Sequence, residues 1–387
     1  MSTAADRRAY RGPALFSFGF RPFFLSAGVW AALTVPLWLT ARIGLMPPSG
    51  IDRVWHAHEM LFGYLAAVVA GFLLTAVPNW TGRIPVLGRP LAALWALWLA
   101  GRLAMVTPWA LSPWAWGLDS LFLLVFAGVI WREILSGRNW RNLGVAAMVS
   151  LLALAHLAFH LLPEASVPAA ERAAVALAAT LIALIGGRVT PSFTRNWLAP
   201  RGEADAVRTR PRLDLAGVIA CALGGAAWTL WPQQPLAGAV LVIAGGLSLA
   251  RLAGWGGLRT LSEPLVLVLH LGYLWLGLGL VLVGASALSP LVPYTAGLHA
   301  LTAGAVGVMT LAMMTRASLG HTGRPRTAGP ATRAVFWLAN LAAVLRVAAG
   351  LGASEALLSL SGLAWTAAFG LFAVSYGPML ILPRRAA

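Results

Sequence analysis

The sequence has few of the residues that support water-soluble or disulfide-stabilised domains. It contains no lysine, it has one cysteine, Cys221, and only 10% of its 387 residues are charged. A single cysteine excludes an internal disulfide and a thiolate metal cluster. By contrast, 59% of the residues are hydrophobic and the mean hydropathy is +0.79, values that a water-soluble domain would reach only by exposing a very large apolar surface. The composition therefore indicates a membrane protein.

Apolar runs of about twenty residues, the length that crosses a bilayer as a helix, recur along the whole chain. They lie near residues 20–40, 55–77, 89–107, 114–134, 142–162, 172–190, 213–231, 236–253, 264–284, 294–315, 331–350 and 356–381. Alternating ten-residue segments are absent, which favours helices over a barrel. The sequence therefore predicts an all-α polytopic membrane protein with about twelve transmembrane helices, in a single transmembrane domain over residues 1–387.

The formal net charge of +16 comes from 28 arginines against 12 acidic residues. Most of these arginines fall in alternate loops between the apolar runs, from the N-terminal segment to the loop near 316–333. The positive-inside rule explains this pattern, and it places both termini in the cytoplasm. We therefore expect a multi-pass protein of a bacterial inner (cytoplasmic) membrane. We expect its arginines to interact with the lipid bilayer and not with nucleic acid.

Three short segments near the ends of apolar runs resemble one another. They are "TAVPNWTGR" at 75–83, "RVTPSFTRN" at 188–196 and "RASLGHTGR" at 316–324. Their spacings of 113 and 128 residues, about a third of the chain, predict repeats of four helices each. These repeats would cover residues of about 10–135, 136–253 and 254–387. The same spacings place His58, Glu171 and His299 at equivalent positions.

Histidines inside apolar runs are candidate functional residues, because burying an ionisable group in a bilayer costs several kcal/mol. His156 and His160 are four residues apart, so both rings face one side of a helix. They would either share a metal or form an interhelical hydrogen-bonded pair. His56 and His58 are two apart and face nearly opposite ways, so they serve different partners. Neutral imidazole suits haem iron and copper.

Acidic residues beside these histidines have two interpretations each. Glu59 would accept a proton from a ligand imidazole or form part of a proton path; alternatively it is an interfacial anchor. Glu171 would replace a ligand in the second repeat or pair with Arg172. Arg102 and Asp119 lie at similar depth on neighbouring runs, which favours a structural ion pair. No CxxCH motif occurs, so a haem would be held without covalent attachment.

Several longer segments resemble the signatures of the NnrS family over essentially the whole chain. They are "FSFGFRPFFLSAG" (16–28), "WHAHEMLFGY" (55–64), "AGFLLTAVPNWTGR" (70–83), "GGRVTPSFTRNWL" (186–198) and "GLHALTAGAVGVMTLAMMTRASLGHTGR" (297–324). The resemblance implies a twelve-span bacterial inner-membrane protein that contains haem and copper and is associated with denitrification and nitrosative-stress resistance. It implies haem-binding or metal-binding histidines, namely His56, His58 and His299, with His156, His160 and His270 as further candidates.

Two functions remain open at this point. The favoured hypothesis is a haem and copper protein that binds or detoxifies nitric oxide, with Glu59 as a base. As an enzyme it would be similar to a nitric oxide reductase and would take electrons from quinol or another donor. Three four-helix units would also resemble the subunit architecture of haem-copper oxidases. The alternative is a twelve-helix transporter whose membrane histidines move protons or copper.

Overall fold

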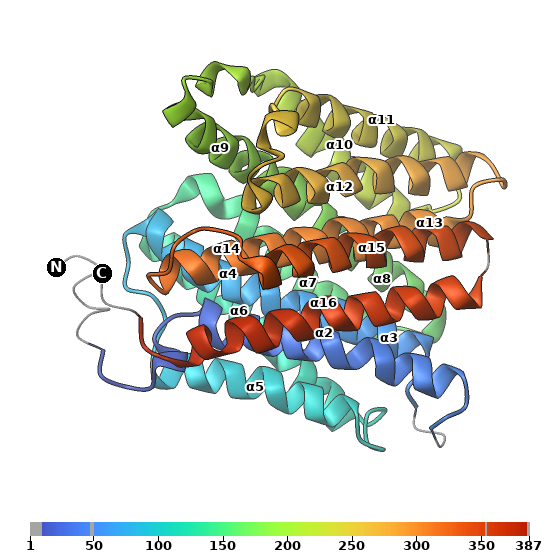
Figure 1. The fold of residues 1–387 in the computed structure, drawn as a ribbon. Helices are drawn as coiled ribbons and strands as arrows, with labels where there is room; N and C mark the ends of the chain where they lie inside the picture. Colours follow the sequence, from blue (N-terminus) through green and yellow to red (C-terminus); the bar gives the residue numbers. More distant parts are fainter. Residues whose placement is uncertain (1–9, 47–49, 353, 385–387) are drawn as a thin grey trace. The chain divides into compact units, whose positions relative to one another are not determined.

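The computed structural model describes residues 10–46, 50–352 and 354–384, and within these ranges the chain is all-helical, with no strand (Figure 1). This confirms the all-α prediction. The α-helices are α2 (Phe20–Arg42), α3 (Arg53–His58), α4 (Ala66–Thr81), α5 (Arg89–Met105), α6 (Pro113–Ser136), α7 (Leu143–Leu161), α8 (Val167–Leu181), α9 (Gly187–Leu198), α10 (Pro211–Leu230), α11 (Pro235–Ala253), α12 (Pro264–Leu288), α13 (Tyr294–His299), α14 (Met309–His321), α15 (Pro330–Gly352) and α16 (Glu355–Ile381).

Ten helical segments of the described chain are long and apolar enough to cross a bilayer. They are Phe20–Arg42, Arg53–Thr81, Trp140–Leu161, Glu164–Arg201, Pro211–Leu230, Pro235–Ala253, Pro264–Leu288, Tyr294–His321, Pro330–Gly352 and Glu355–Ile381. The two other predicted spans, near 89–107 and 114–134, are the helices α5 and α6, which are not among these ten. With 17 residues, α5 extends about 26 Å, a little less than the hydrocarbon core. The chain is thus a membrane protein by its helices, and a count of twelve spans stays a prediction.

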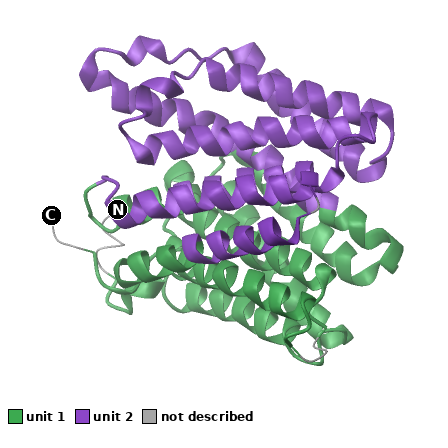
Figure 2. Ribbon diagram, turned by 45° about the vertical axis from the view of Figure 1, so that its right-hand side comes forward, with its two compact units in different colours: residues 1–171, 314–325, 369–387 green, residues 172–313, 326–368 purple. Residues whose placement is uncertain are grey.

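The chain divides into two compact units, which Figure 2 distinguishes by colour. Unit 1 comprises residues 1–171, 314–325 and 369–387, and unit 2 comprises residues 172–313 and 326–368. The three predicted repeats were derived from sequence similarity and stay a prediction.

Local sequence signals explain where several helices begin. The Asp52 side chain accepts a hydrogen bond from the Trp55 backbone N–H, at 2.8 Å, and so caps α3. Proline occupies the first turn of α5, α6, α10, α11 and α12, where its missing N–H costs nothing. These boundaries lie close to those expected from the apolar runs.

Three of the spans contain a π-helical segment, a feature often found at functional sites. The segments are η2 (Glu59–Leu65), η5 (Ile182–Gly186) and η9 (Ala300–Val308). They interrupt the same three spans that carry the short sequence repeat. In addition, η2 begins directly after His58 and η9 directly after His299.

Within unit 1, α6 is the central helix for the site described below. It packs against α4, α5 and α7, while α2 packs against α4 and η2. The side chains on the facing surfaces of η2, α5, α6 and α7 therefore meet inside this unit.

Within unit 2, α10, α11 and α12 lie side by side (Figure 1). Glycines allow α11 and α12 to approach closely. A Cβ atom on Gly245 would lie 2.7 Å from the Gly277 carbonyl oxygen, and one on Gly284 would lie 2.5 Å from the Gly238 carbonyl oxygen. Such small-residue contacts are typical of helices packed within a membrane.

Candidate metal centre

Four side chains in unit 1 converge on one buried point. They are His58 at the end of α3, Asp119 on α6, and His156 and His160 on α7. One ligand atom from each lies within 4.8 Å of the ligand atoms of the other three. Three imidazoles and a carboxylate are a donor set that zinc, copper and iron accept.

Four of the distances between these atoms are close to the spacing of ligands around a small metal ion. His58 Nε2 lies 3.0 Å from His156 Nε2. Asp119 Oδ2 lies 3.0 Å from His58 Nε2, 3.1 Å from His156 Nε2 and 3.2 Å from His160 Nε2. Donors of a tetrahedral site with bonds of about 2.0–2.1 Å are about 3.3 Å apart.

Aromatic side chains cover the cluster and separate it from solvent. The Phe62 ring stacks on the His156 ring with centroids 4.4 Å apart, and the Phe159 ring lies 4.9 Å from that of His58. His58, Asp119 and His156 are each no more than 2% exposed. In such an environment every polar atom without a partner is costly.

A second layer of polar groups holds His58 in place. Glu59 Oε1 lies 2.9 Å from His58 Nδ1 and accepts a hydrogen bond from it. Glu59 Oε2 accepts hydrogen bonds from Arg102 Nη1 at 2.5 Å and from Trp30 Nε1 at 2.7 Å. Glu59 is therefore an acceptor on both oxygens, and it sets the tautomer of His58.

Arg102 connects the two carboxylates of the site. Its Nη1 atom donates to Glu59 and its Nη2 atom donates to Asp119 Oδ1. The ion pair between Arg102 and Asp119 that was predicted from the sequence is thus confirmed. Because Arg102 binds Oδ1, the other oxygen of Asp119 faces the three imidazoles.

Two glycines make room for this arrangement. A Cβ atom on Gly63 would lie 2.6 Å from Arg102 Nη1 and 2.8 Å from Glu59 Oε2. A Cβ atom on Gly101 would lie 2.7 Å from Asp119 Oδ1. These contacts are closer than side chains tolerate, so α5, α6 and η2 approach at these distances only with glycine at both positions.

Two arrangements of protons in the cluster each leave an unfavourable contact. With its Nδ1 proton directed at Glu59, a neutral His58 can accept from His156 Nε2, but the lone pair of its Nε2 also faces Asp119 Oδ2, which is itself an acceptor. If His58 carried a second proton and donated it to His156, then His156 Nε2 would face Asp119 Oδ2 with its own lone pair, and its proton would be on Nδ1. That Nδ1 atom is buried and has no hydrogen-bond partner. A cation among the four donors removes the repulsion between their lone pairs.

The other predicted histidines lie outside this cluster. His56 stacks on Trp38 in unit 1, with ring centroids 4.4 Å apart. In unit 2, His299 Nδ1 lies 2.8 Å from the Thr295 carbonyl oxygen, to which it donates. His270 Nε2 lies 2.8 Å from Thr194 Oγ1.

The Glu171 carboxylate binds Arg53 at 3.0 Å. Arg172 Nη2 donates to the Thr229 carbonyl oxygen. The pair of Glu171 with Arg172 stays a prediction. Asp119 was expected to take part only in an ion pair, and its second oxygen among the imidazoles was missed. A carboxylate in the apolar run 114–134 was the available signal.

Comparison with known proteins identifies a family for this chain. The family model described as NnrS protein matches residues 14–384, nearly the whole chain. No curated protein matches the sequence.

Proposed function

The chain belongs to the NnrS family, and from this premise and the buried cluster we propose a metal-containing membrane protein that binds or detoxifies nitric oxide. The observation that carries the metal assignment is the position of His58 Nε2. It lies 3.0 Å from both His156 Nε2 and Asp119 Oδ2 while its other nitrogen is held by Glu59.

Copper is the metal that we assign to the cluster, with His58, His156, His160 and Asp119 as the residues that would hold it. Glu59, Asp119 and Arg102 together carry one net negative charge when the two carboxylates are ionised. A singly charged cation would neutralise this buried set, and imidazole is a good copper ligand. Bound copper would supply a redox-active site for a small ligand.

Haem is the second cofactor of this proposal, and His299 is the residue that we assign to its iron. The hydrogen bond from His299 Nδ1 to the Thr295 carbonyl oxygen places the proton on Nδ1, so Nε2 would be the nitrogen that coordinates iron. Haem-ligating histidines are oriented in this way by a partner on the second ring nitrogen. His270 fits less well, because its Nε2 atom is engaged with Thr194. Bound haem would supply an iron that takes up nitric oxide.

The protein side chains around the cluster have separate tasks. Phe62 and Phe159 exclude water, which suits a small uncharged ligand such as nitric oxide. Glu59 holds the Nδ1 proton of His58, and Arg102 keeps Glu59 and Asp119 in place. Because both oxygens of Glu59 are occupied within the protein, we assign it a positioning role in place of the base expected from the sequence.

The remaining parts of the proposal follow from the sequence and the family. The protein would lie in a bacterial inner membrane with both termini in the cytoplasm. Reduction of nitric oxide would require an external electron donor, for which quinol in the same bilayer is a suitable source. The alternative function, proton or copper transport, would use the same buried cluster and differs in that the metal must be released.

The test is the metal content and spectrum of the full-length protein purified under anaerobic conditions. We expect stoichiometric copper and a Soret band that shifts when nitric oxide is added, and formation of nitrous oxide would show turnover. His156→Ala and His160→Ala should each lose copper, whereas His56→Ala, at the ring stacked on Trp38, should keep it. Equal copper content in all three variants would reject the cluster assignment. The transporter would be favoured if the protein released its copper and if nitric oxide left its spectrum unchanged.

A further inference from the structure

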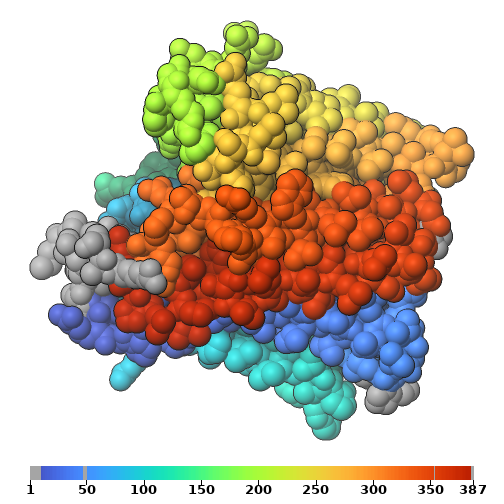
Figure 3. All heavy atoms as spheres, viewed as in Figure 1, coloured from blue at the N-terminus to red at the C-terminus, as the bar shows by residue number. Residues whose placement is uncertain are grey.

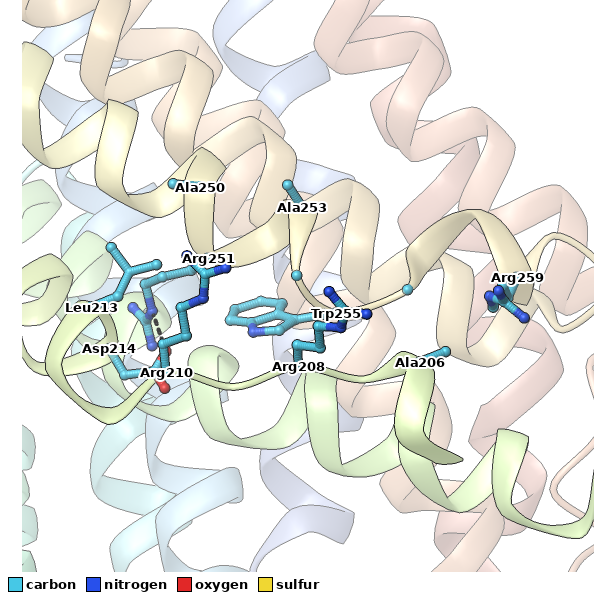
Figure 4. A pocket seen from close by; sticks show the side chains of 12 residues that line it. Ala206, Arg208, Arg210, Leu213, Asp214, Ala250, Arg251, Ala253, Trp255 and Arg259 are labelled. Atoms are coloured by element: carbon cyan, nitrogen blue, oxygen red, sulfur yellow. Dashed lines mark hydrogen bonds and ion pairs between the residues drawn. The ribbon is translucent and has the colours of Figure 1, made fainter. Parts of the chain in front are cut away.

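A basic pocket of about 420 Å³ lies in unit 2, at one end of helices α10 and α11 (Figure 4). Its walls come from two segments that are far apart in sequence, residues 206–214 and 250–259. In the space-filling view the green segment near residue 200 lies against the yellow segment near residue 255 (Figure 3). The volume is in the range of pockets that bind small ligands.

The two walls are joined by the backbone, so the pocket is a built feature of the fold. The Arg208 N–H donates to the Gly254 carbonyl oxygen at 2.8 Å. A Cβ atom on Gly254 would lie 2.7 Å from the Arg208 carbonyl oxygen, so glycine is needed for this approach. Gly256 has a φ of +67°, the left-handed conformation that glycine adopts readily.

Four arginines line the pocket, and two of them already have acidic partners. Arg251 is buried and its Nε donates to Asp214 Oδ1 at 2.9 Å. Arg259 pairs with Glu203 at 2.5 Å. These two arginines therefore add little net charge to the pocket.

Arg208 and Arg210 supply the uncompensated charge. Both are exposed, and neither has an ion-pair partner among the residues that the structure describes. Figure 4 shows Arg208 beside the ring of Trp255 and Arg210 near the pair formed by Arg251 and Asp214. Two guanidinium groups in one concave site are well suited to the oxygens of a phosphate.

The surroundings of the pocket are apolar although its lining is charged. Leu215 on α10 is 62% exposed, and Leu258 and Leu261, next to the pocket-lining Arg259, are 86% and 64% exposed. Helices that cross a bilayer end at the level of the lipid headgroups. Basic side chains at this level, flanked by exposed leucines, would contact a lipid headgroup and its acyl chains together.

We propose that this pocket binds the phosphate group of an anionic phospholipid, with Arg208 and Arg210 as its principal ligands. The site is independent of the metal cluster, because it lies wholly in unit 2 and shares no residue with it. Free inorganic phosphate has the same chemistry, so the experiment must separate these two sources.

The experiment uses full-length protein in detergent and measures its thermal stability as ligand is added. The ligands are phosphatidylglycerol, the zwitterionic phosphatidylcholine with the same acyl chains, and sodium phosphate. The double variant Arg208→Gln/Arg210→Gln is compared with Arg138→Gln/Arg141→Gln, which removes two exposed arginines from the loop between α6 and α7. The double variant Arg208→Lys/Arg210→Lys keeps the charge and removes the bidentate geometry. Native mass spectrometry counts the lipids retained by each protein.

We expect phosphatidylglycerol to stabilise the unmodified protein and the loop control, and phosphatidylcholine to have little effect. Removing each charge-assisted contact should weaken binding by about tenfold, so the glutamine variant should need roughly 100-fold more lipid. The lysine variant should lie between these two, and all variants should keep their copper content. Equal stabilisation by phosphate alone would support the pocket and assign it to a free anion. No preference for phosphatidylglycerol, or an unchanged preference in the glutamine variant, would overturn the proposal.

Discussion

Replacing Glu59 with glutamine removes the charge of the second layer and keeps its shape. In the native site Glu59 accepts from His58 Nδ1, Arg102 Nη1 and Trp30 Nε1. An amide has one acceptor oxygen and one donor nitrogen. The glutamine side chain of Glu59→Gln would therefore direct its NH2 group either at the proton of His58 or at the guanidinium of Arg102. In the first orientation His58 loses its acceptor, and in the second both Arg102 and Trp30 lose theirs.

The expected loss of copper affinity in Glu59→Gln follows from the role of Glu59 in orienting His58. Loss of a group that orients a metal-ligating histidine costs about 10–100-fold in metal affinity. This corresponds to about 1.4–2.8 kcal/mol of binding free energy. Glu59→Gln should therefore bind copper(I) one to two orders of magnitude more weakly than the unmodified protein. The measurement is competition with a coloured copper(I) chelator on the purified protein.

Glu133→Gln is the matched control for this experiment. Glu133 is also a buried carboxylate of unit 1, on α6, and it pairs with Arg83 at 2.7 Å and with Arg132. It does not belong to the cluster of four candidate metal ligands. If Glu59→Gln and Glu133→Gln bind copper equally well, the assignment of Glu59 as the group that orients His58 is refuted.

Two further predictions concern packing and the second cofactor. Gly63→Ala should destabilise the protein by about 1–3 kcal/mol, because the added methyl group would collide with Arg102. Gly117→Ala on α6, where nothing lies within 4 Å of the added atom, should be neutral or stabilising. Thermal unfolding measures both variants, and equal midpoints would contradict the packing argument. His299→Ala should lose the Soret band. His321→Ala should keep it, because the native His321 ring packs against aromatic side chains. An unchanged spectrum in His299→Ala would exclude His299 as the iron ligand.

The helices could be predicted from the sequence because each one satisfies a local rule. An apolar run of about twenty residues predicts a spanning helix, and α12 (Pro264–Leu288) begins where the run at 264–284 begins. The spacing of His156 and His160 predicts one shared face, and both rings lie against Asp119 Oδ2. The spacing of His56 and His58 predicts different partners, which the structure shows as Trp38 and the cluster.

The convergence of side chains from α3, α6 and α7 on one point could not be predicted in the same way. Asp119 is recognisable in the sequence as a carboxylate in an apolar run, but its second oxygen has a role only because α7 packs against α6. Trp30 donates to Glu59 only because α2 packs against η2. Periodicity describes one helix at a time, whereas these contacts depend on the interfaces between helices and on Gly63 and Gly101.

The contact between the adjacent residues His58 and Glu59 lies where a π-helical segment begins, and we expect it to depend on that segment. Neighbouring side chains of an α-helix diverge by about 100°, so they rarely meet, yet here His58 Nδ1 and Glu59 Oε1 are 2.9 Å apart. A π-helical turn contains an extra residue. Deleting Met60 should restore regular α-helix, rotate His58 by about 100° relative to α4, and abolish copper binding while the helical content is kept. Met60→Ala, which preserves the number of residues, should keep copper. Circular dichroism and metal analysis measure both outcomes, and a folded deletion variant that retains copper would show that the site does not require the π-helical turn.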